Sequence, residues 1–307
     1  MRKQRLDTLL AERGLFASRT RAAASVMAGE VCVGPGRRRA QKPGELVAVD
    51  CELSVAERAR YVSRGGIKLE NALTGTGIGV AVAGRLALDV GVSTGGFTDC
   101  LLQRGAAEVV AVDVGYGELA YTLRVDPRVR VLERTNARHL TPQIVRDALA
   151  RPSGGKGAQD AEPELPDLAV IDVSFISLTK ILPAVLGCLR DSCEVLALIK
   201  PQFEVGRAAV GSGGVVRDAE TRRAALVSVG LAASELGVRV RGYCSSGLPG
   251  PKGNRETFVW LTRGGHTSAA VTHRVPASVA APSAPPASDP VGQGAAELEQ
   301  MAREVEP

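Results

Sequence analysis

The sequence lacks the hallmarks of membrane, secreted and zinc-binding proteins. No segment approaches the roughly 18 consecutive apolar residues that a membrane-spanning helix needs. The N-terminal stretch MRKQRLDTLLAER is charged and amphipathic, unlike a signal peptide. The six cysteines contain no CxxC pair, and only three histidines are present. We therefore expect a cytoplasmic protein with buried thiols, without a disulfide framework and without a bound metal.

Lysine is also scarce, and the positive charge is unevenly distributed. The 38 basic residues are 7 lysines and 31 arginines, and the net charge is +5. Residues 1–60 contain 12 basic and 7 acidic residues, a difference of +5, so the remainder of the chain is close to neutral. A basic end on a neutral body is the pattern expected of a module that binds a polyanion. A plain solvated surface is the alternative interpretation of the same count.

The central part of the chain has the pattern of an α/β domain. Residues 61–264 alternate apolar runs with amphipathic stretches, and this rhythm predicts a Rossmann-like fold with a doubly wound, mainly parallel sheet. The stretch at residues 151–166 is expected to be a mobile surface insertion. The apolar runs that predict strands are Leu86–Val92, Val109–Val114, Leu168–Val173 and Val195–Ile199.

The segments on either side of this domain differ from it. Residues 1–60 combine helical spacing at Arg5–Glu12 and Ser18–Met27 with a β-hairpin pattern that begins at Gly29, which predicts a small α+β domain. Residues 265–307 are rich in Ala, Pro, Ser and Val, and their composition predicts a disordered tail.

A glycine-rich turn follows the first apolar run of the α/β domain. The run LALDV leads into GVSTGG and then into the helical stretch FTDCLLQRG. Glycines allow the backbone to approach a ligand closely, and a helix N-terminus offers unpaired N–H groups. We therefore predict that this turn binds a cofactor. The candidate residues are Asp89, Gly91, Ser93, Thr94, Gly95, Gly96 and Phe97.

Two polar residues after later strands extend this candidate site. Asp113 ends the second run, where a carboxylate can accept hydrogen bonds from a ribose diol. Asn136 follows the third strand, where a Rossmann-type ligand places its adenine, although asparagine also suits a turn. An acid after the second strand is common to NAD-binding folds, but the turn lacks the G-x-G-x-x-G pattern. Because S-adenosylmethionine carries a cationic methionine moiety that Asp89 can hold, we expect it as the cofactor.

Four charged residues form a second group. Asp172 and Lys200 each end an apolar run, and doubly wound folds place their chemistry at the carboxyl ends of strands. Lys68 precedes the first strand, and Glu256 lies at the last one. A partly buried lysine, unlike arginine, can release its proton, so a lysine at the end of an apolar strand indicates a functional role. An ordinary surface lysine is the alternative interpretation.

These four residues fit the transfer of a methyl group from a sulfonium to a substrate oxygen. Such a displacement requires proximity and a base for a weakly acidic hydroxyl. Lys200 can be that base once it has lost its proton. Asp172 and Glu256 would orient the two lysines and balance their charge.

At these residues the chain resembles the TlyA family, bacterial rRNA 2′-O-methyltransferases also known as hemolysin A. The resemblance covers most of residues 1–263 and includes the strings SRGGIKLENAL, LDVGVSTGGFTDCLL, DVSFISL and KPQFEVGR. It implies an FtsJ-like domain that uses S-adenosylmethionine to methylate cytidine ribose in ribosomal RNA of the large and, for some members, the small subunit. The Lys-Asp-Lys-Glu tetrad of the family corresponds to Lys68, Asp172, Lys200 and Glu256.

The first zone resembles the small RNA-binding module of ribosomal protein S-four and of pseudouridine synthases. A basic helix pair followed by a hairpin suits recognition of folded RNA through its shape and phosphates. The implied partner is ribosomal RNA within ribosomal subunits. The candidate RNA contacts are Arg5, Arg19, Arg21, Arg37, Arg38, Arg39 and Arg64.

Four alternative functions fit the sequence less well. A base methyltransferase would need an Asn-Pro-Pro-aromatic motif or a Pro-Cys nucleophile, and neither string is present. A NAD-dependent oxidoreductase fits the fold but not the glycine turn. A haemolytic protein would need a membrane-active segment, which the sequence lacks. An RNA-binding protein with an inactive methyltransferase fold would not need the four charged residues.

Overall fold

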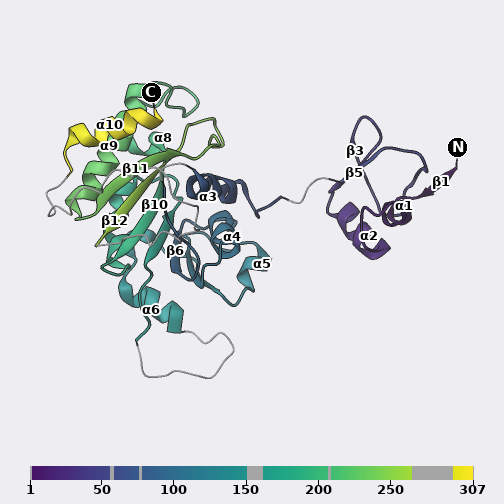
Figure 1. Cartoon of the computed structure of the whole chain (residues 1–307), viewed down its shortest axis with the longest axis horizontal. Helices are drawn as coiled ribbons and strands as arrows, with labels where there is room; N and C mark the ends of the chain where they lie inside the picture. Colours follow the sequence, from purple (N-terminus) through teal and green to yellow (C-terminus); the bar gives the residue numbers. More distant parts are fainter. Residues whose placement is uncertain are drawn as a thin grey trace, which may run out of the picture. The chain divides into compact units, whose positions relative to one another are not determined.

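The computed structural model describes residues 2–55, 59–75, 78–150, 162–206, 209–264 and 293–306. The chain divides into two compact units, a first unit of Met1–Arg60 and a second unit of Tyr61–Pro307 (Figure 1). Each unit has its own hydrophobic core.

The first unit combines two short helices with two small sheets. Helices α1 (Leu6–Glu12) and α2 (Arg19–Met27) pack together, and Ser18 caps α2 by accepting a hydrogen bond from the Arg21 N–H. β2 pairs with β3 and β5, and β1 pairs with β4. The helix pair and the hairpin are confirmed, whereas the β1–β4 pair escapes prediction because such short strands show no alternation. The strands are β1 (Lys3–Arg5), β2 (Val31–Val33), β3 (Arg38–Arg39), β4 (Leu46–Ala48) and β5 (Leu53–Val55).

A seven-stranded sheet with the order β11-β12-β10-β9-β6-β7-β8 forms the centre of the second unit. The five neighbouring strands β8, β7, β6, β9 and β10 run parallel to one another. β12 lies between β10 and β11 and is antiparallel to both. The predicted mainly parallel sheet is therefore confirmed. The strands are β6 (Leu86–Val90), β7 (Glu108–Val112), β8 (Val129–Leu132), β9 (Leu168–Ile171), β10 (Cys193–Ile199), β11 (Arg239–Ser245) and β12 (Thr257–Arg263).

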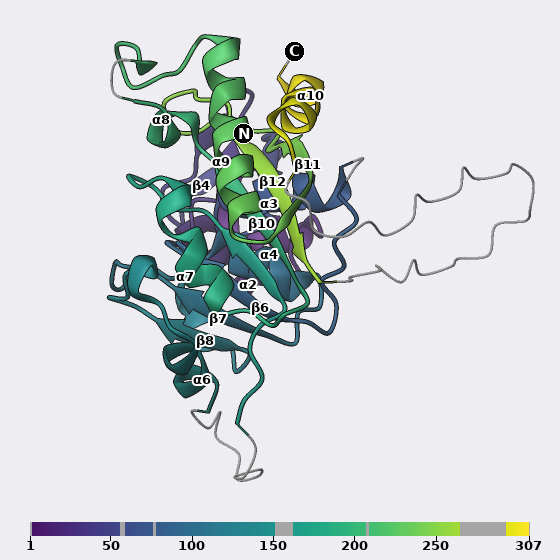
Figure 2. The ribbon, with the colours of Figure 1, turned by 90° about the vertical axis from the view of Figure 1, so that its left-hand side faces the viewer.

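Helices cover both faces of this sheet (Figure 2). Because both faces are buried, the central strands are mostly apolar, and all seven residues of β10 are buried. One face packs against α6 (Pro142–Ala150), α7 (Leu182–Gly187) and α9 (Ala219–Glu235). The other packs against α3 (Arg64–Thr74), α4 (Gly96–Gln103) and α5 (Tyr121–Arg124). Shorter elements are η1 (Ala137–His139), η2 (Leu178–Lys180) and α8 (Pro201–Glu204).

The C-terminal part of the chain corrects one expectation. Residues 265–292 of the predicted disordered tail lie outside the described residues. Helix α10 (Ala295–Val305), however, is ordered and lies beside α9 and β11 (Figures 1 and 2). Leu298 and Ala302 are fully buried in this contact. The prediction of disorder is wrong here because these two residues lie one helical turn apart and supply an apolar stripe that average composition conceals.

Gln293 joins the same segment to the edge of the sheet. Its side-chain amide donates a hydrogen bond to the Val240 carbonyl at 2.9 Å and accepts one from the Val240 N–H at 2.6 Å. Val240 belongs to β11, the outermost strand on this side. Both backbone groups of an edge residue are thereby paired.

All six cysteines are free thiols. The prediction that they are buried is correct for Cys100, Cys188 and Cys193, while the other three are partly exposed. Within the described ranges, no helix combines the length and the apolar character needed to cross a membrane. Of the predicted insertion, residues 151–161 lie outside the described residues, and residues 162–166 form neither helix nor strand.

Tyr61 and helix α3 form a tightly packed corner of the second unit. The Tyr61 side chain is buried, and its hydroxyl donates a hydrogen bond to Glu70 at 2.9 Å. A Cβ atom on Gly66 would lie 2.3 Å from the Tyr61 ring. Glycine is therefore required at this position by the close approach of the ring to the helix backbone.

We predict that Gly66→Ala destabilises the second unit by about 1–3 kcal/mol, the usual cost of overpacking a filled core. Gly187→Ala is the matched control, because a Cβ there meets no atom within 4 Å, and it should change the free energy of unfolding by less than about 1 kcal/mol. Urea unfolding measures both values. Equal stability of the two variants would contradict the packing described at Tyr61.

Candidate active site

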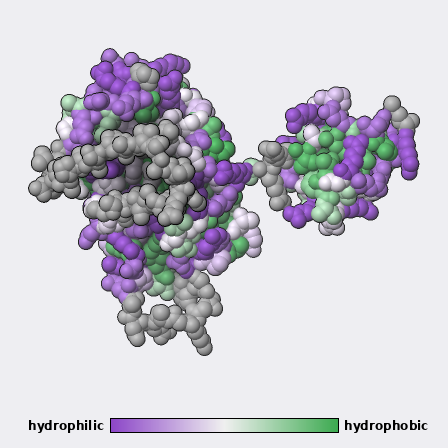
Figure 3. All heavy atoms as spheres, in the orientation of Figure 1, coloured by the Kyte–Doolittle hydropathy of each residue, from purple (hydrophilic) through white to green (hydrophobic). Residues whose placement is uncertain are grey.

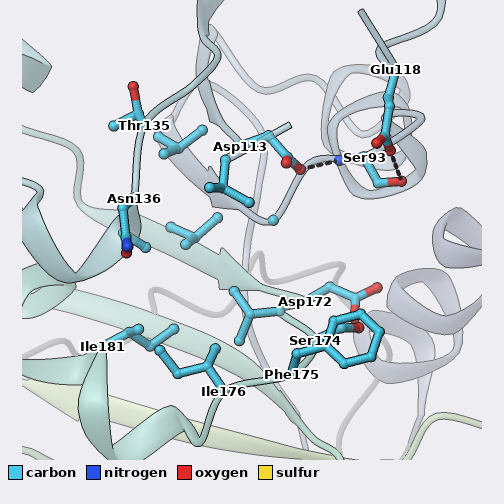
Figure 4. Close-up of a pocket in the computed structure, with 16 residues that line it drawn as sticks. Ser93, Asp113, Glu118, Thr135, Asn136, Asp172, Ser174, Phe175, Ile176 and Ile181 are labelled. Atoms are coloured by element: carbon cyan, nitrogen blue, oxygen red, sulfur yellow. Dashed lines mark hydrogen bonds between the residues drawn. The ribbon is translucent and has the colours of Figure 1, made fainter. Parts of the chain in front are cut away.

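The carboxyl ends of β6, β7, β9 and β10 meet at one edge of the sheet, because parallel strands all end on the same side. Two adjoining pockets lie there, with volumes of about 450 and 190 Å³. The larger one is shown in Figure 4. Residues that are far apart in the sequence thus meet in one place. Both pockets are lined by Gly91, Ser93, Asp172 and Ser174.

Asp113 supplies the main charged group of the larger pocket. It follows β7, and its carboxylate accepts hydrogen bonds from the backbone N–H groups of Ser93 and Gly115, each at 2.7 Å. These contacts fix the carboxylate at the pocket wall (Figure 4). A carboxylate held in this way retains lone pairs that can accept hydrogen bonds from a diol.

Asn136 and two isoleucines form another part of the larger pocket. The Asn136 side chain accepts a hydrogen bond from the Arg138 N–H and thereby begins η1. Asn136 therefore lines the pocket, and it also forms a turn, which was the alternative role considered for this asparagine. Ile176 and Ile181 line the side opposite Asp113 (Figure 4). This apolar surface suits a flat aromatic base.

The turn after β6 packs its backbone against the end of β9. Gly91 ends the strand two residues earlier than predicted, with a φ angle of 87°. A Cβ atom on it would lie 2.5 Å from the Asp172 carbonyl oxygen. Ser93 has a φ angle of 45°, which is uncommon for a residue with a side chain, and its hydroxyl donates to Glu118 at 3.1 Å. The smaller pocket is lined further along the turn by Thr94, Gly96 and Phe97.

Two residues of the predicted turn, Asp89 and Gly95, line neither pocket. A Cβ atom on Gly95 would lie 2.4 and 2.7 Å from the side chains of Leu123 and Leu119. Asp89 is fully buried, and its carboxylate accepts a hydrogen bond from the Thr98 hydroxyl at 2.6 Å. Both residues therefore support the turn from beneath. Their contact with a cofactor stays a prediction.

The environment of Asp89 favours its neutral form. Burial raises the pKa of Asp89 to about 7. The hydrogen bond from Thr98 opposes this rise, and the negative charges of Asp172 and Asp113 add to it. A change in protonation next to the cofactor turn therefore falls in the physiological pH range.

The four charged residues form two ion pairs at the smaller pocket. Lys68 Nζ lies 2.5 Å from Glu256 Oε2, and Lys200 Nζ lies 2.6 Å from Asp172 Oδ1. Lys200 also donates a hydrogen bond to the Ser174 hydroxyl at 2.9 Å. Lys68 and Lys200 are 7% and 9% exposed, so both ammonium groups require the nearby carboxylates.

The sheet topology explains why these residues meet. Asp172 follows β9 and Lys200 follows β10, and the two strands are parallel neighbours. Lys68 lies on α3, whereas Glu256 immediately precedes β12, the strand that pairs with β10 on its other side. Strand ends pointed to Asp172 and Lys200 in the sequence. The structure brings Lys68 and Glu256, which are 188 positions apart, to the same place.

Phe175 is a prominent site residue that the sequence analysis missed. It lines the larger pocket, is 92% exposed and has a φ angle of 66°. Its ring lies 5.3 Å from the ring of Phe203, and it lies next to Asp172 and Ser174 (Figure 4). An aromatic residue in an apolar run is normally expected in the core, so the pattern DVSFISL gave no sign of an exposed ring.

Glu204 anchors the loop that carries Phe175. Its carboxylate accepts hydrogen bonds from the Ser177 hydroxyl at 2.6 Å and from the Leu178 N–H at 2.9 Å. Burial raises the pKa of Glu204. Other lining residues that the sequence analysis missed are Ser63, Glu118, Thr135, Ser174, Ile176 and Ile181.

The arginines predicted to contact RNA are all exposed. In the first unit, Arg5 and Arg19 lie 2.8 and 3.1 Å from Asp7, and together they hold the pKa of Asp7 well below its usual range. Arg38 pairs with Glu45. In the second unit, Arg64 donates a hydrogen bond to the Pro249 carbonyl at 2.7 Å. The remaining predicted contacts, Arg21, Arg37 and Arg39, form no side-chain ion pair within the described part of the chain.

The two pockets have complementary chemistry. The larger one offers a carboxylate, an amide and an apolar wall, which fit a nucleoside. The smaller one offers two lysines and the Asp172 carboxylate, which can bind a hydroxyl group and accept its proton. Among the described residues, no cluster of His, Cys, Asp or Glu could hold a metal ion.

Comparison with known proteins agrees with this geometry. The FtsJ-like methyltransferase family matches residues 61–263. The 16S/23S rRNA (cytidine-2'-O)-methyltransferase TlyA of Mycobacterium tuberculosis is 48% identical over 85% of this chain and 90% of its own length. A protein of Brachyspira hyodysenteriae named hemolysin A is 37% identical over 82% of this chain and 97% of its own length.

A solved structure gives the same result at the level of the fold. A protein of Streptococcus thermophilus described as a hemolysin is 41% identical, with a TM-score of 0.60 over 86% of this chain and 89% of that one. The match to the FtsJ-like domain and the identity along most of the chain lead to one assignment. This chain belongs to the TlyA family of FtsJ-like methyltransferases.

Proposed function

We propose that this protein transfers a methyl group from S-adenosylmethionine to a ribose 2′-hydroxyl of ribosomal RNA. The observation that carries the proposal is the position of two buried ion pairs, Lys68–Glu256 and Lys200–Asp172, directly beside a pocket that fits a nucleoside. The relative from M. tuberculosis is named for the cytidine 2′-oxygen of 16S and 23S rRNA. We therefore propose cytidine in ribosomal subunits, within the cytoplasm, as the target.

The larger pocket would hold the cofactor. Asp113 would accept hydrogen bonds from the two ribose hydroxyls, and Asn136 would bind the adenine beside Ile176 and Ile181. When bound, S-adenosylmethionine supplies a methyl group on a positively charged sulfur. The carboxyl group of Asp89 lies beneath the turn. In its ionised form it would stabilise the positive charge on the sulfur of the bound cofactor.

Lys200 is the residue that we assign to the substrate proton. Its Nζ atom lies at the smaller pocket, between the Asp172 carboxylate and the Ser174 hydroxyl. As a neutral amine it would accept the proton of the ribose hydroxyl, while Asp172 keeps the amine directed into the pocket. Lys68, held by Glu256, would donate a hydrogen bond to the same oxygen and stabilise its growing negative charge.

Phe175 would hold the nucleobase of the target nucleotide. An exposed ring at the mouth of the site offers a flat surface on which a base can stack. Phe175 has a positive φ angle, and Glu204 fixes the adjoining residues of the loop. Stacking would place the attached ribose near Lys200, because Phe175 follows Asp172 by only three positions.

The first unit would bind RNA outside the active site. Its charge of +5 and its exposed arginines suit contacts with phosphate groups. Hydrophilic side chains surround a hydrophobic area on its visible face (Figure 3). Arg5 and Arg19 share Asp7, which fixes both guanidinium groups on one side of α1 and α2. Pre-ordered cations of this kind favour recognition of a folded RNA by shape.

We predict that Lys200→Ala lowers methyl transfer to isolated ribosomal subunits by about 10²–10⁴-fold, the range for losing a positioned acid–base group. Transfer is measured with radiolabelled S-adenosylmethionine, and alkali-resistant linkages identify 2′-O-methylation. Cofactor binding, measured by calorimetry, should change little because Lys200 does not line the larger pocket.

Lys200→Arg should be as inactive as Lys200→Ala, since arginine does not release its proton. The exposed residue Lys180 is the matched control, and Lys180→Ala should keep full activity. Normal activity of Lys200→Arg, or label on a base, would refute the assigned chemistry. A wild-type protein that binds both subunits but labels neither would support an RNA-binding protein with an inactive methyltransferase fold.

We predict that Phe175→Ala lowers kcat/KM for ribosomal RNA by about 5–150-fold, which corresponds to the loss of about 1–3 kcal/mol of base stacking. Phe175→Trp should keep most of the activity because it preserves the flat surface. S-adenosylmethionine is kept at a saturating concentration for all three proteins, because Phe175 also lines the larger pocket. If Phe175→Ala retained the wild-type kcat/KM, the ring would have no role in holding the base.

The free protein should lose stability as the pH rises through about 7, because burial raises the pKa of Asp89 to about 7. An acid whose pKa is raised in the folded state stabilises the fold below its unfolded pKa of about 4, and this contribution is lost as the pH rises through the folded value. Asp89→Asn should remove roughly 2–4 kcal/mol of this dependence. The exposed control Asp147→Asn should leave it intact, and urea unfolding between about pH 5 and 8 gives the comparison.

A further inference from the structure

Residues 293–306, here named the C-terminal clasp, are bound tightly to the body of the second unit. Helix α10 packs against α9, with Leu298 and Ala302 fully buried. A Cβ atom on Gly230 of α9 would lie 3.2 Å from the Leu298 side chain and 2.5 Å from the Tyr243 hydroxyl. Glycine thus leaves room on α9 for Leu298 of the clasp and for the Tyr243 hydroxyl.

Glu306 ends the clasp in a buried ion pair with Arg222 of α9. Nε and Nη2 of Arg222 donate to Glu306 Oε2 at 3.0 and 2.8 Å, and the two side chains are 8% and 4% exposed. Arg255 lies 3.4 Å from the same oxygen, but its side chain is 67% exposed, so solvent weakens the attraction. Arg222 is therefore the main partner of Glu306.

Arg222 connects this pair to the segment that precedes Glu256. Its remaining nitrogen, Nη1, donates to the carbonyls of Arg217 at 2.7 Å and Val216 at 3.3 Å. The Val216 N–H in turn donates to Asn254 Oδ1 at 2.9 Å. Asn254 is buried and lies two residues before Glu256. A continuous chain of hydrogen bonds therefore leads from the clasp to the catalytic segment.

Asn254 also fixes the loop around the Glu256 carboxylate. The side-chain amide of Asn254 donates a hydrogen bond to the Gly214 carbonyl at 2.8 Å. The backbone carbonyl of Asn254 accepts one from the Gly250 N–H at 2.9 Å. A Cβ atom on Gly250 would lie 2.3 Å from Glu256 Oε1, so the loop backbone touches the carboxylate. Movement of this loop would displace the oxygen atoms that hold Lys68.

We propose that Glu306 is a positioning residue, which holds Glu256 and through it Lys68 in the geometry needed for methyl transfer; this inference rests on the proposed function. Without the Glu306 carboxylate, the buried guanidinium of Arg222 loses two hydrogen bonds and turns toward water. The carbonyls at 216 and 217 then lose their donor, and Asn254 loses its fixed partner. The Lys200–Asp172 pair is held by β9 and β10 and stays in place.

The first test compares Glu306→Gln with Glu304→Gln by amide hydrogen exchange. Glu304 is exposed on the same helix and provides the matched control. In Glu306→Gln, the N–H groups of Val216 and Gly250 should exchange on the order of tenfold faster, since both depend on Asn254. The Leu178 N–H, which is bonded to Glu204, should be unchanged, as should all sites in Glu304→Gln.

The second test measures methyl transfer. In Glu306→Gln, kcat should fall on the order of tenfold, because misplacement of a catalytic pair slows the chemical step. KM for S-adenosylmethionine should stay within about twofold, since the larger pocket does not include the network. Glu306→Asp keeps the charge and should restore most of the rate. If Glu306→Gln does not fold, Arg222→Lys replaces it in both tests, because it keeps a cation for Glu306 but removes the donor to the carbonyls of Val216 and Arg217.

Two results would overturn the inference. One is a loss of thermal stability with normal exchange at Val216 and Gly250, which would make α10 a stabilising element only. The other is a normal kcat in Glu306→Gln despite faster exchange. The exchange test needs no substrate, so it remains decisive if the wild-type protein fails to methylate RNA, a failure that would refute the proposed function alone.

Discussion

The need to neutralise two buried lysines is the constraint on which the arrangement of the second unit depends. Removing an ammonium group from water costs several kcal/mol unless a carboxylate lies close by. Lys68 is neutralised by Glu256 and Lys200 by Asp172, and in each pair the carboxylate comes from a different element than the lysine. The sheet must therefore place β12 and β9 on either side of β10, as it does. The antiparallel β12 is thus as important for the site as the parallel strands that form its floor.

The sequence predicts the charged groups of the site better than it predicts their surroundings. Asp172 and Lys200 stand out because a polar residue after an apolar run in a parallel sheet must lie at the functional edge. Asp89 and Gly95 belong to the same glycine-rich turn as true lining residues, yet they face the interior. A motif gives the order of residues along a turn, but the side to which each one points depends on packing against α4 and α5.

The features that escaped prediction share a physical cause, which is that they depend on contacts between distant segments. The ordered helix α10 has an apolar stripe that is stable only against α9, and composition alone suggested disorder. The exposed Phe175 lies on a loop that is tied to Glu204 on a different element. The strand β1 forms only because β4 provides its hydrogen bonds. In each case the local sequence permits the structure without specifying it.

The contact between Gln293 and β11 also concerns how copies of this protein behave toward one another. An outer strand offers free N–H and C=O groups to any extended chain, and such edges promote association between molecules. Gln293 occupies both groups of Val240, next to an irregularity in the strand register between Val240 and Gly242. At Val240, a side chain thus takes the place that an added strand would need.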